Sequence, residues 1–343
     1  MRAVVIHAPH DLRVDSVEVP ALGDHDVRVR MEAGGICGSD LHYYHDGGFG
    51  TVRIKQPMIL GHEVAGTVEA IGAGVSRVAV GQRIAVNPSL ACGHCRFCQA
   101  GQQAYCLDMR FIGSAMRFPH VQGGFRETMV VEEARAVPVA DGVSAGEAAF
   151  GEPLSVCLHA IRRAGSLLGK RVLITGCGPI GSLCIIVARR AGALEIVATD
   201  VSDAACAMAM KVGANRAVNT ATAPDAMAGY AADKGTFDVL IEASGNQRAL
   251  TGAFDWLRPG AVIVQLGIGG DFTLPISVVV AKEFEIRGSF RFHEEFEQAV
   301  SMIGQRLIDV SPLLTATLPI DRAVEAFELA SDRSRAMKVQ LAF

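Results

Sequence analysis

The spacing of hydrophobic residues changes near residue 170. Before that point apolar residues recur in short runs or at every second position, as in Val27, Val29 and Met31, between glycine-containing turns. Such alternation predicts half-buried strands, and many short strands predict a small β-barrel or sandwich. Beyond residue 170 we expect apolar strands to alternate with helices, at 171–176, 182–191, 195–199, 202–211, 237–242, 249–257, 261–266 and 284–288. This order predicts an α/β domain with a parallel sheet.

The last fifty residues return to a mixed pattern. Helical periodicity is predicted at 294–303 and 322–330, and a terminal strand at 338–341. We take this tail to return to the first domain. At 343 residues the chain is long enough for two hydrophobic cores.

Composition excludes several classes of function. The net charge of −4 provides no basic surface for nucleic acid. No apolar run approaches the roughly 20 residues that cross a bilayer, so no membrane partner is expected. Pro9 and Asp11 interrupt the amino-terminal segment where a signal peptide would continue its apolar stretch, and the cytoplasm is therefore the expected location.

A compact group of thiols follows the first strands. Of nine cysteines, four lie in one segment, at Cys92, Cys95, Cys98 and Cys106. Their spacing permits tetrahedral coordination of zinc by four thiolates, which would be a closed, structural site. An iron–sulfur cluster begins with a similar spacing, but the Cys-Pro that continues it is absent. Because clustered cysteines without an export signal more often hold metal than form disulfides, we expect a zinc lobe at about residues 90–108.

A second candidate metal site lies between residues 34 and 63. Thiolate, imidazole and carboxylate are the side chains that bind zinc, and this stretch carries Cys37, His62 and Glu63. A catalytic zinc uses three such ligands and leaves a fourth position open. Ligands this far apart carry no spacing code, however, and a lone cysteine is usually a small buried residue.

Capping signals place two other polar side chains. Ser39 and Asp40 favour the start of a short helix, because both residue types are good caps. Glu152 stands at the start of an apolar helix, where a carboxylate commonly serves as a cap or a dipole partner. From there its carboxylate could also reach a catalytic metal.

The sequence at 176–181, GCGPIG, stands between a predicted strand and a predicted helix. It fits G-x-G-x-x-G, in which the glycines form the turn, admit the pyrophosphate of a dinucleotide and allow close packing of helix on strand. Asp200 ends the next strand, nineteen residues past Gly181. An acid there accepts hydrogen bonds from the ribose of NAD and repels the extra phosphate of NADP. The expected NAD-binding residues are Gly176, Gly178, Pro179, Ile180, Gly181, Asp200 and Gly267, the last in a loop after a strand.

These features, in this order, resemble the zinc-dependent medium-chain dehydrogenase family along the whole chain. The marks of the family are GHEVAGTVEAIG at 61–72, the four-cysteine lobe and the glycine motif. GICGSDLHYY at 35–44, with Glu152-Pro153 in place of a metal-binding cysteine, is similar to the sorbitol dehydrogenase branch. The resemblance implies a GroES-like β-barrel catalytic domain of residues 1–150 and 293–343, a Rossmann NAD-binding domain of residues 151–292, and an active site in the cleft separating them.

The resemblance also implies roles for single residues. The metal ligands of the branch are matched by Cys37, His62 and Glu63. Glu152 matches a third ligand position of alcohol dehydrogenases, and the sequence leaves open which carboxylate touches the zinc. Ser39 and His42 match a relay that carries the substrate proton away through the cofactor ribose. Two zinc ions per chain are therefore expected, one catalytic and one structural.

The expected reaction transfers a hydride between NAD and a sugar acid or, alternatively, a neutral polyol such as sorbitol or xylitol. Tyr43 and Arg291 match substrate-contacting positions of the branch. A sugar acid favours a guanidinium partner, for which the candidates are Arg110, Arg117 and Arg291, although each could equally be solvated or meet the cofactor. A catalytically silent cofactor-binding protein is a remote alternative. The apolar strand at 284–288 predicts pairing with a second subunit, as a homodimer or homotetramer.

Overall fold

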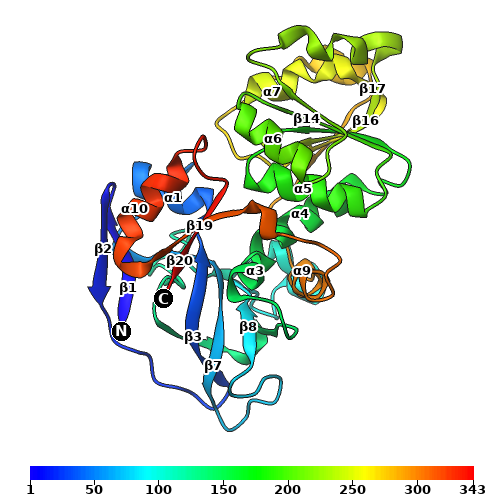
Figure 1. Cartoon of the computed structure of the whole chain (residues 1–343). Helices are drawn as coiled ribbons and strands as arrows, with labels where there is room; N and C mark the ends of the chain where they lie inside the picture. The colour runs from blue at the N-terminus through cyan, green and yellow to red at the C-terminus, as the bar shows by residue number, and fades with distance from the viewer. The chain divides into compact units, whose positions relative to one another are not determined.

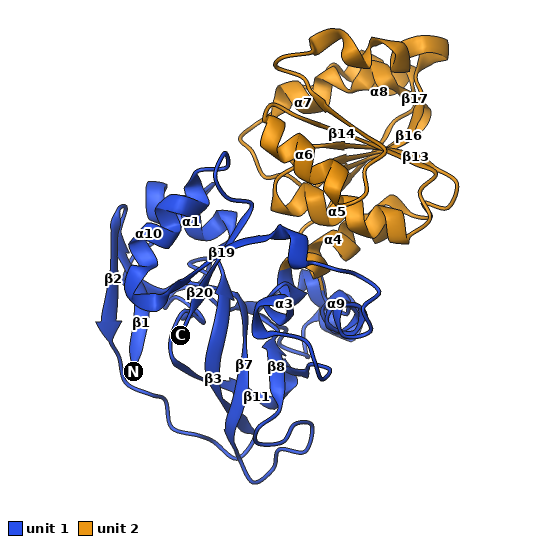
Figure 2. Cartoon of the chain, in the orientation of Figure 1, with its two compact units in different colours: residues 1–152, 293–343 blue, residues 153–292 orange.

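The computed structural model describes all 343 residues and divides them into two compact units (Figure 2). Unit 1 consists of residues 1–152 and 293–343, and unit 2 consists of residues 153–292. Each unit has its own cluster of buried apolar side chains. None of the helices combines the length and the apolar character that crossing a bilayer requires.

Unit 2 contains a six-stranded parallel sheet with helices packed around it (Figure 1). The strands run in the order β15-β14-β13-β16-β17-β18, which is the doubly wound order of dinucleotide-binding domains. In chain order they are β13 (Arg171–Thr175), β14 (Glu195–Asp200), β15 (Arg216–Asn219), β16 (Phe237–Glu242), β17 (Leu257–Gln265) and β18 (Glu285–Gly288). The helices are α4 (Gly151–Ala164), α5 (Pro179–Arg190), α6 (Asp203–Lys211), α7 (Gln247–Gly252) and α8 (Ile276–Ala281). The predicted alternation of strands and helices is confirmed.

One predicted element of unit 2 was wrong in its extent. The helix expected at 249–257 ends at Gly252, and β17 begins as early as Leu257. Leu257 pairs with Phe237 of β16 and is completely buried. Its contacts within the sheet therefore determine a strand conformation, although the helical periodicity had predicted a helix there.

Unit 1 consists mainly of antiparallel strands. A seven-stranded sheet has the order β12-β8-β7-β3-β20-β19, and β11 pairs with β3 as well. Its strands are β3 (Asp26–Gly35), β7 (Glu63–Ile71), β8 (Arg83–Val86), β11 (Thr128–Glu132), β12 (Ala136–Pro138), β19 (Leu314–Pro319) and β20 (Lys338–Ala342). A smaller sheet contains β1 (Arg2–Ala8), β2 (Asp11–Ser16) and β6 (Met58–Ile59). Two two-stranded sheets pair β4 (Gly48–Phe49) with β5 (Val52–Arg53) and β9 (Ser89–Leu90) with β10 (Arg110–Phe111). The helices are α1 (Gly38–Asp46), α2 (Arg96–Gln99), α3 (Ala145–Ala149), α9 (Glu295–Gly304) and α10 (Ala323–Ser331).

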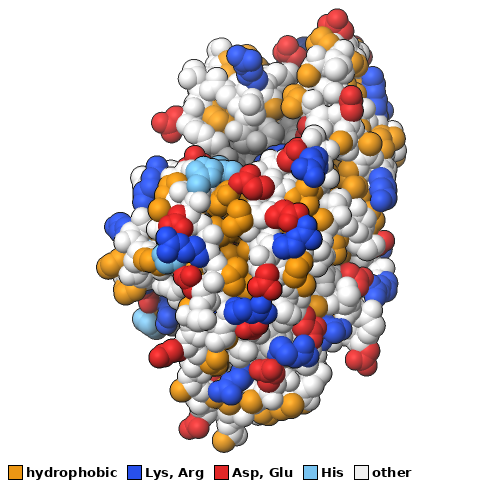
Figure 3. Space-filling view, turned by 60° about the vertical axis from the view of Figure 1, so that its left-hand side comes forward, with side chains coloured by type: hydrophobic (Ala, Val, Ile, Leu, Met, Phe, Trp, Pro, Cys, Tyr) orange, Lys and Arg blue, Asp and Glu red, His pale blue; other side chains and the backbone are white.

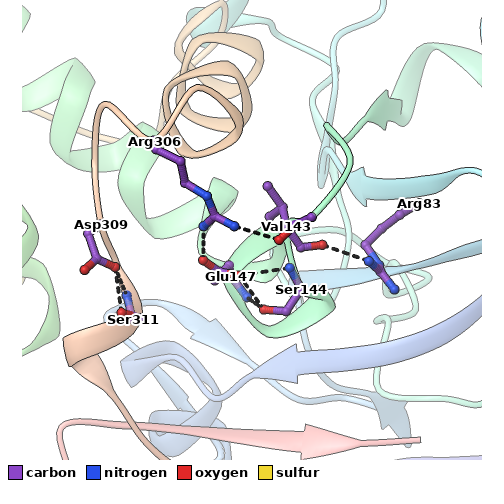
Figure 4. A network of polar contacts seen from close by, with 8 residues as sticks. Arg83, Val143, Ser144, Glu147, Arg306, Asp309 and Ser311 are labelled. Atoms are coloured by element: carbon purple, nitrogen blue, oxygen red, sulfur yellow. Dashed lines mark hydrogen bonds and ion pairs between the residues drawn. The ribbon is translucent and has the colours of Figure 1, made fainter.

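The C-terminal tail belongs to unit 1, as the sequence predicted. β20 pairs antiparallel with β3, with Gln340 opposite Gly35. Polar contacts near α3 join the same two parts of the chain (Figure 4). Arg306 forms an ion pair with Glu147 and donates a 2.6 Å hydrogen bond to the carbonyl of Gly142, and Ser144 caps α3 by accepting the N–H of Glu147.

One face of the molecule is mixed in charge. On the face in Figure 3, basic and acidic side chains lie interspersed among small apolar groups. This distribution agrees with a chain whose net charge is only −4.

Candidate active site and cofactor site

The pairing of β3 with β7 brings together three of the four predicted ligands of the catalytic metal. The two strands run antiparallel, with Gly35 opposite Glu63. Cys37 follows the end of β3 and His62 precedes β7, so the ligand atoms of Cys37, His62 and Glu63 all lie within 4.8 Å of one another. A Cβ atom at position 35 would lie 2.1 Å from Glu63 Oε2, so only glycine leaves room for this carboxylate.

The chemistry of these side chains fits a zinc ion. His62 Nδ1 and Glu63 Oε2 are both buried, and neither has a hydrogen-bond partner. Buried polar atoms without partners are rare, because the energy of solvating them is lost. An ion bound by the Cys37 thiolate, a ring nitrogen of His62 and the Glu63 carboxylate would supply a partner that the protein itself does not provide.

Asp40 holds the two ligand-bearing segments together. This fully buried carboxylate accepts the N–H of Cys37 at 3.0 Å and the N–H of Gly61 at 3.2 Å. Its Oδ1 also lies 3.8 Å from His62 Nδ1. Burial raises the pKa of Asp40, against the opposing effect of His62. The helix start predicted at Ser39 and Asp40 is confirmed as α1, whose N-cap is Cys37 and whose third residue, Asp40, caps the helix by accepting the Cys37 N–H.

Lys338 faces the same site from the other end of the chain. Its ammonium donates hydrogen bonds to Glu63 Oε1 at 2.6 Å and to the carbonyl of Ile36 at 3.0 Å. It also lies 2.5 Å from Oε2, without the alignment of a hydrogen bond. Burial alone would lower the pKa of Lys338, but the charge of Glu63 raises it above its ordinary value. The only signal for this residue in the sequence is its place at the start of an apolar terminal strand.

Glu152 lies in the first turn of α4, at the predicted helix start. Only 5% of its surface is exposed, and burial raises its pKa to about 8, with His62 opposing and Glu63 adding to the shift. The cluster of three ligand atoms includes Glu63 and does not include Glu152. The geometry therefore favours Glu63 as the carboxylate nearest to an ion.

The helix after Cys37 carries the predicted relay and one predicted substrate residue. Ser39 lies in the first turn of α1, and His42 is exposed, with Nδ1 3.4 Å from Asp46. Tyr43 is buried, and its hydroxyl accepts the N–H of Ala115 at 3.0 Å. The assigned roles of Ser39, His42 and Tyr43 stay predictions.

The four cysteines of the lobe converge as predicted. Their sulfur atoms all lie within 4.8 Å of one another, with Cys95 Sγ 3.5 Å and Cys92 Sγ 4.0 Å from Cys98 Sγ. Tetrahedral zinc with bonds of about 2.3 Å separates its sulfur ligands by roughly 3.8 Å. The N–H groups of Cys98 and Leu107 lower the pKa of Cys95 to about 6, which favours the thiolate that zinc binds. The sulfur set therefore fits a closed zinc site.

The glycine motif adopts the predicted strand–turn–helix arrangement. Gly176 has a φ of +85°, and a Cβ atom there would lie 2.7 Å from the backbone nitrogen of Ser244. Gly178 is the N-cap of α5, which begins at Pro179. The carboxylate of Asp200 accepts the N–H of Cys177 at 2.6 Å, so the acid that ends β14 also fixes the turn. Within the motif, a Cβ atom at Gly181 would lie 1.8 Å from the Gly176 carbonyl oxygen.

A second loop, at the carboxyl end of β16 and β17, is organised by Glu242. This fully buried carboxylate accepts hydrogen bonds from the N–H groups of Ser244 and Gly245 and from Gln265 Nε2, at 2.8, 3.0 and 2.6 Å. Gly267 packs so closely that a Cβ atom there would lie 2.1 Å from Gly245 N. Glu242 was not among the predicted site residues, because its only signal in the sequence is an acid at the end of an apolar strand.

The predicted substrate arginines occupy different places. Arg110 and Arg117 line a cavity of about 620 Å³ in unit 1, whose lining includes none of the three clustered metal ligands. Arg291 belongs to unit 2, where its guanidinium carbon lies 5.0 Å from the ring centre of Phe290. Their substrate roles stay predictions.

Family models match both halves of the chain. Residues 23–141 match the alcohol dehydrogenase GroES-like domain, and residues 179–305 match the zinc-binding dehydrogenase model. The predicted combination of a GroES-like domain and a Rossmann domain is thereby confirmed.

Relatives match nearly the whole chain. L-idonate 5-dehydrogenase (NAD(P)(+)) of Escherichia coli (strain K12) is 44% identical over 92% of this chain and 91% of its own. Sorbitol dehydrogenase of Homo sapiens is 34% identical over 95% of this chain and 91% of its own. A crystal structure of L-idonate 5-dehydrogenase from Escherichia coli str. K-12 substr. MG1655 superposes with a TM-score of 0.94 at 41% identity, covering 100% and 98% of the two chains.

These matches confirm the predicted enzyme class, a dehydrogenase that requires zinc and NAD(P). The predicted sorbitol dehydrogenase branch is also confirmed, because sorbitol dehydrogenases are among the relatives. The chain therefore belongs to the zinc-dependent medium-chain dehydrogenase family, and it is an alcohol or polyol dehydrogenase.

Proposed function

We propose that this protein interconverts L-idonate and 5-keto-D-gluconate with NAD as the hydride acceptor. The observation that carries the proposal is the 44% identity to an L-idonate 5-dehydrogenase over 92% of the chain. The convergence of Cys37, His62 and Glu63 supports it, because oxidation of a secondary alcohol in this family needs a metal next to the hydroxyl.

The ligand set assigns a task to each residue around the metal. A zinc ion held by Cys37, His62 and Glu63 would supply Lewis acidity at the substrate hydroxyl, while NAD would accept the hydride from the same carbon. Asp40 orients the Cys37 segment through its backbone contacts, and Lys338 fixes the rotamer of Glu63. Glu152 lies beside the three ligands as a buried carboxyl group able to hold a proton or a water molecule.

Oxidation also releases the hydroxyl proton, and the first helix offers it a path. The Ser39 hydroxyl lies two residues after Cys37 on α1, within the segment that Asp40 fixes. His42, one turn further, is exposed, so its imidazole can pass a proton on to solvent. We therefore assign proton removal to Ser39 and His42, in that order.

The two units divide the work in this proposal. Unit 1 is the catalytic domain, and unit 2, with its glycine turn and Asp200, is the NAD-binding domain. The acid at the end of β14 supports NAD over NADP, because a carboxylate repels the additional phosphate. The two convergent ligand sets support two zinc ions per chain.

We also propose that the protein is a homodimer or a homotetramer. β18 is an edge strand of the parallel sheet, and its Ile286 is 41% exposed. An open edge strand that exposes an apolar side chain favours pairing with a second copy. Sedimentation velocity should give a mass at least twice 36.2 kDa, and a monomer would contradict this part of the proposal.

A substrate panel tests the function. Steady-state kinetics with L-idonate, 5-keto-D-gluconate, sorbitol and xylitol, each with NAD(H) and NADP(H), should give the highest kcat/KM for the idonate pair with NAD. The 34% identity to sorbitol dehydrogenases favours sorbitol as the second candidate. A higher kcat/KM for sorbitol or xylitol would replace the first assignment with that one.

Arg291 is our first candidate for the carboxylate of L-idonate. A charge-assisted hydrogen bond is worth about 1.5–3 kcal/mol, so Arg291→Ala should lower kcat/KM for L-idonate roughly tenfold to hundredfold. Sorbitol, which has no carboxylate, should lose far less. Arg190→Ala, an exposed arginine near the end of α5, is the matched control and should change neither value. An equal loss on both substrates would remove the carboxylate assignment.

A further inference from the structure

Four arginines line one cavity in unit 1, whose lining includes none of the clustered metal ligands. The cavity has a volume of about 620 Å³ and lies between β10, the loop after it and β11. Its guanidinium groups belong to Arg110, Arg117, Arg126 and Arg135, and Glu132 is the only acidic residue in the lining. Such an excess of positive charge is unusual in a chain whose net charge is −4.

Two of these arginines already have partners. Arg135 lies 3.0 Å from Glu132 and donates to the carbonyl of Pro88 at 3.2 Å. Arg117 forms an ion pair with Asp108 and donates to a backbone carbonyl at 2.8 Å. The charges of Arg135 and Arg117 are therefore each compensated by a carboxylate, and Glu132, the one acid of the lining, already has a partner.

Arg126 is different. Its side chain is buried, with 7% exposed, and its Nε has no hydrogen-bond partner. Burial lowers the pKa of Arg126 to about 10, and no carboxylate acts against that effect. An unpaired buried cation is strongly unfavourable unless an anion compensates it. Arg110, which is exposed, likewise has a guanidinium without a protein partner.

The two remaining polar side chains of the lining, Gln122 and His120, do not compensate these charges, and Gln122 Oε1 already accepts the N–H of Ile59 at 2.8 Å. His120 accepts the N–H of Lys55 at Nε2, at 2.9 Å, so its Nδ1 carries the proton that is donated to the carbonyl of Arg117 at 2.7 Å. Both ring nitrogens are therefore occupied, and this histidine fixes the loop. The cavity thus presents two uncompensated guanidinium groups.

We propose that this cavity is a binding site for a small phosphate-bearing molecule, held by Arg126 and Arg110. A phosphate group carries between one and two negative charges and three acceptor oxygens, which match two guanidinium groups. The volume lies within the roughly 300–1,000 Å³ of small-molecule sites. None of the clustered metal ligands lines the cavity, so phosphate binding there can be measured apart from binding of the metal.

Isothermal titration of the zinc-loaded full chain tests this site without reference to turnover. Inorganic phosphate is titrated at constant ionic strength, with sodium chloride and citrate as comparison salts. Phosphate should bind to the unchanged protein, and Arg126→Met should weaken its affinity roughly tenfold to hundredfold. Arg110→Met, a change at an exposed position, should weaken it as well. Arg13→Met, an exposed arginine paired with Asp11 elsewhere in unit 1, should bind phosphate normally.

Thermal unfolding separates binding from folding. Because Arg126→Met removes an unpaired buried charge, its Tm without phosphate should equal or exceed that of the unchanged protein. Three outcomes would overturn the proposal: phosphate does not bind to the unchanged protein, citrate binds more tightly than phosphate, or both cavity variants bind phosphate with unchanged affinity. Sedimentation velocity provides a further check, because dissociation of an oligomer by Arg126→Met would show that a second copy of the chain fills the cavity.

Discussion

The buried pair of Lys338 and Glu63 allows a quantitative prediction. The two residues are 4% and 1% exposed, and the ammonium lies 2.6 and 2.5 Å from the two carboxylate oxygens. Lys338→Met keeps most of the side-chain volume but leaves Glu63 as an unpaired buried charge. Removing one partner of such a pair costs about 3–5 kcal/mol. For unit 1, with about 200 residues, this corresponds to a Tm lower by roughly 6–20 °C.

Urea unfolding in zinc-free buffer measures this cost. Glu63→Gln should destabilise the protein as well, since it leaves Lys338 unpaired, whereas the double variant Glu63→Gln/Lys338→Met should lie within about 1 kcal/mol of the unchanged protein. Lys170→Met, which breaks a 3.6 Å pair of an exposed lysine with Asp238, is the control and should cost at most about 1 kcal/mol.

Zinc should change the result in a defined direction. A metal ion beside Glu63 supplies the positive charge that Lys338→Met has removed, so added zinc should stabilise this variant more than the unchanged protein. The reasoning is refuted if the losses of the two single variants simply add in the double variant. It is equally refuted if zinc raises the Tm of both proteins by the same amount.

Three further changes test other parts of the molecule. Cys98→Ser should reduce the zinc content from about two ions per chain to about one, measured by plasma mass spectrometry, because the lobe loses one of four ligands; an unchanged content would contradict this. Asp200→Asn keeps an oxygen that can accept the N–H of the glycine turn but loses the charge, so the ratio of kcat/KM for NAD over NADP should fall about tenfold, and a constant ratio would count against the assigned role. Gly176→Ala should raise the Kd for NAD and cost about 1–3 kcal/mol, because φ is +85° and the added Cβ is crowded. Gly169→Ala is the control for backbone strain alone, because Gly169 has a φ of +72° but open space around its Cβ. If both variants changed NAD binding equally, the argument from crowding at Gly176 would be refuted.

Local patterns predicted much of unit 2. The strand before Gly176, the helix after it and the acid that ends β14 all follow from apolar runs and glycine positions within 30 residues. The prediction from hydrophobic periodicity was wrong at Leu257, which was expected in a helix but lies in β17 because it pairs with β16. Contacts between strands distant in the chain leave no trace in the local pattern.

In the candidate site, too, some residues could be predicted from the sequence, whereas others become apparent only from contacts between distant parts of the chain. Cys37, His62 and Glu63 could be selected because their residue types and the family resemblance point to zinc, and the pairing of β3 with β7 brings them together. Lys338 lies 275 positions from Glu63 and reaches it only because β20 pairs with β3. Arg126 is an ordinary arginine in the sequence, and its lack of a partner becomes visible only when its buried surroundings are known.

Anomalous diffraction at the zinc edge, from crystals grown with the metal, tests the central claim most directly. The account predicts two peaks per chain, one among the four cysteines of the lobe and one about 2.0–2.3 Å from Cys37 Sγ and a ring nitrogen of His62. A single peak at the lobe, with none between Cys37 and His62, would contradict the assignment of this site as the catalytic metal centre.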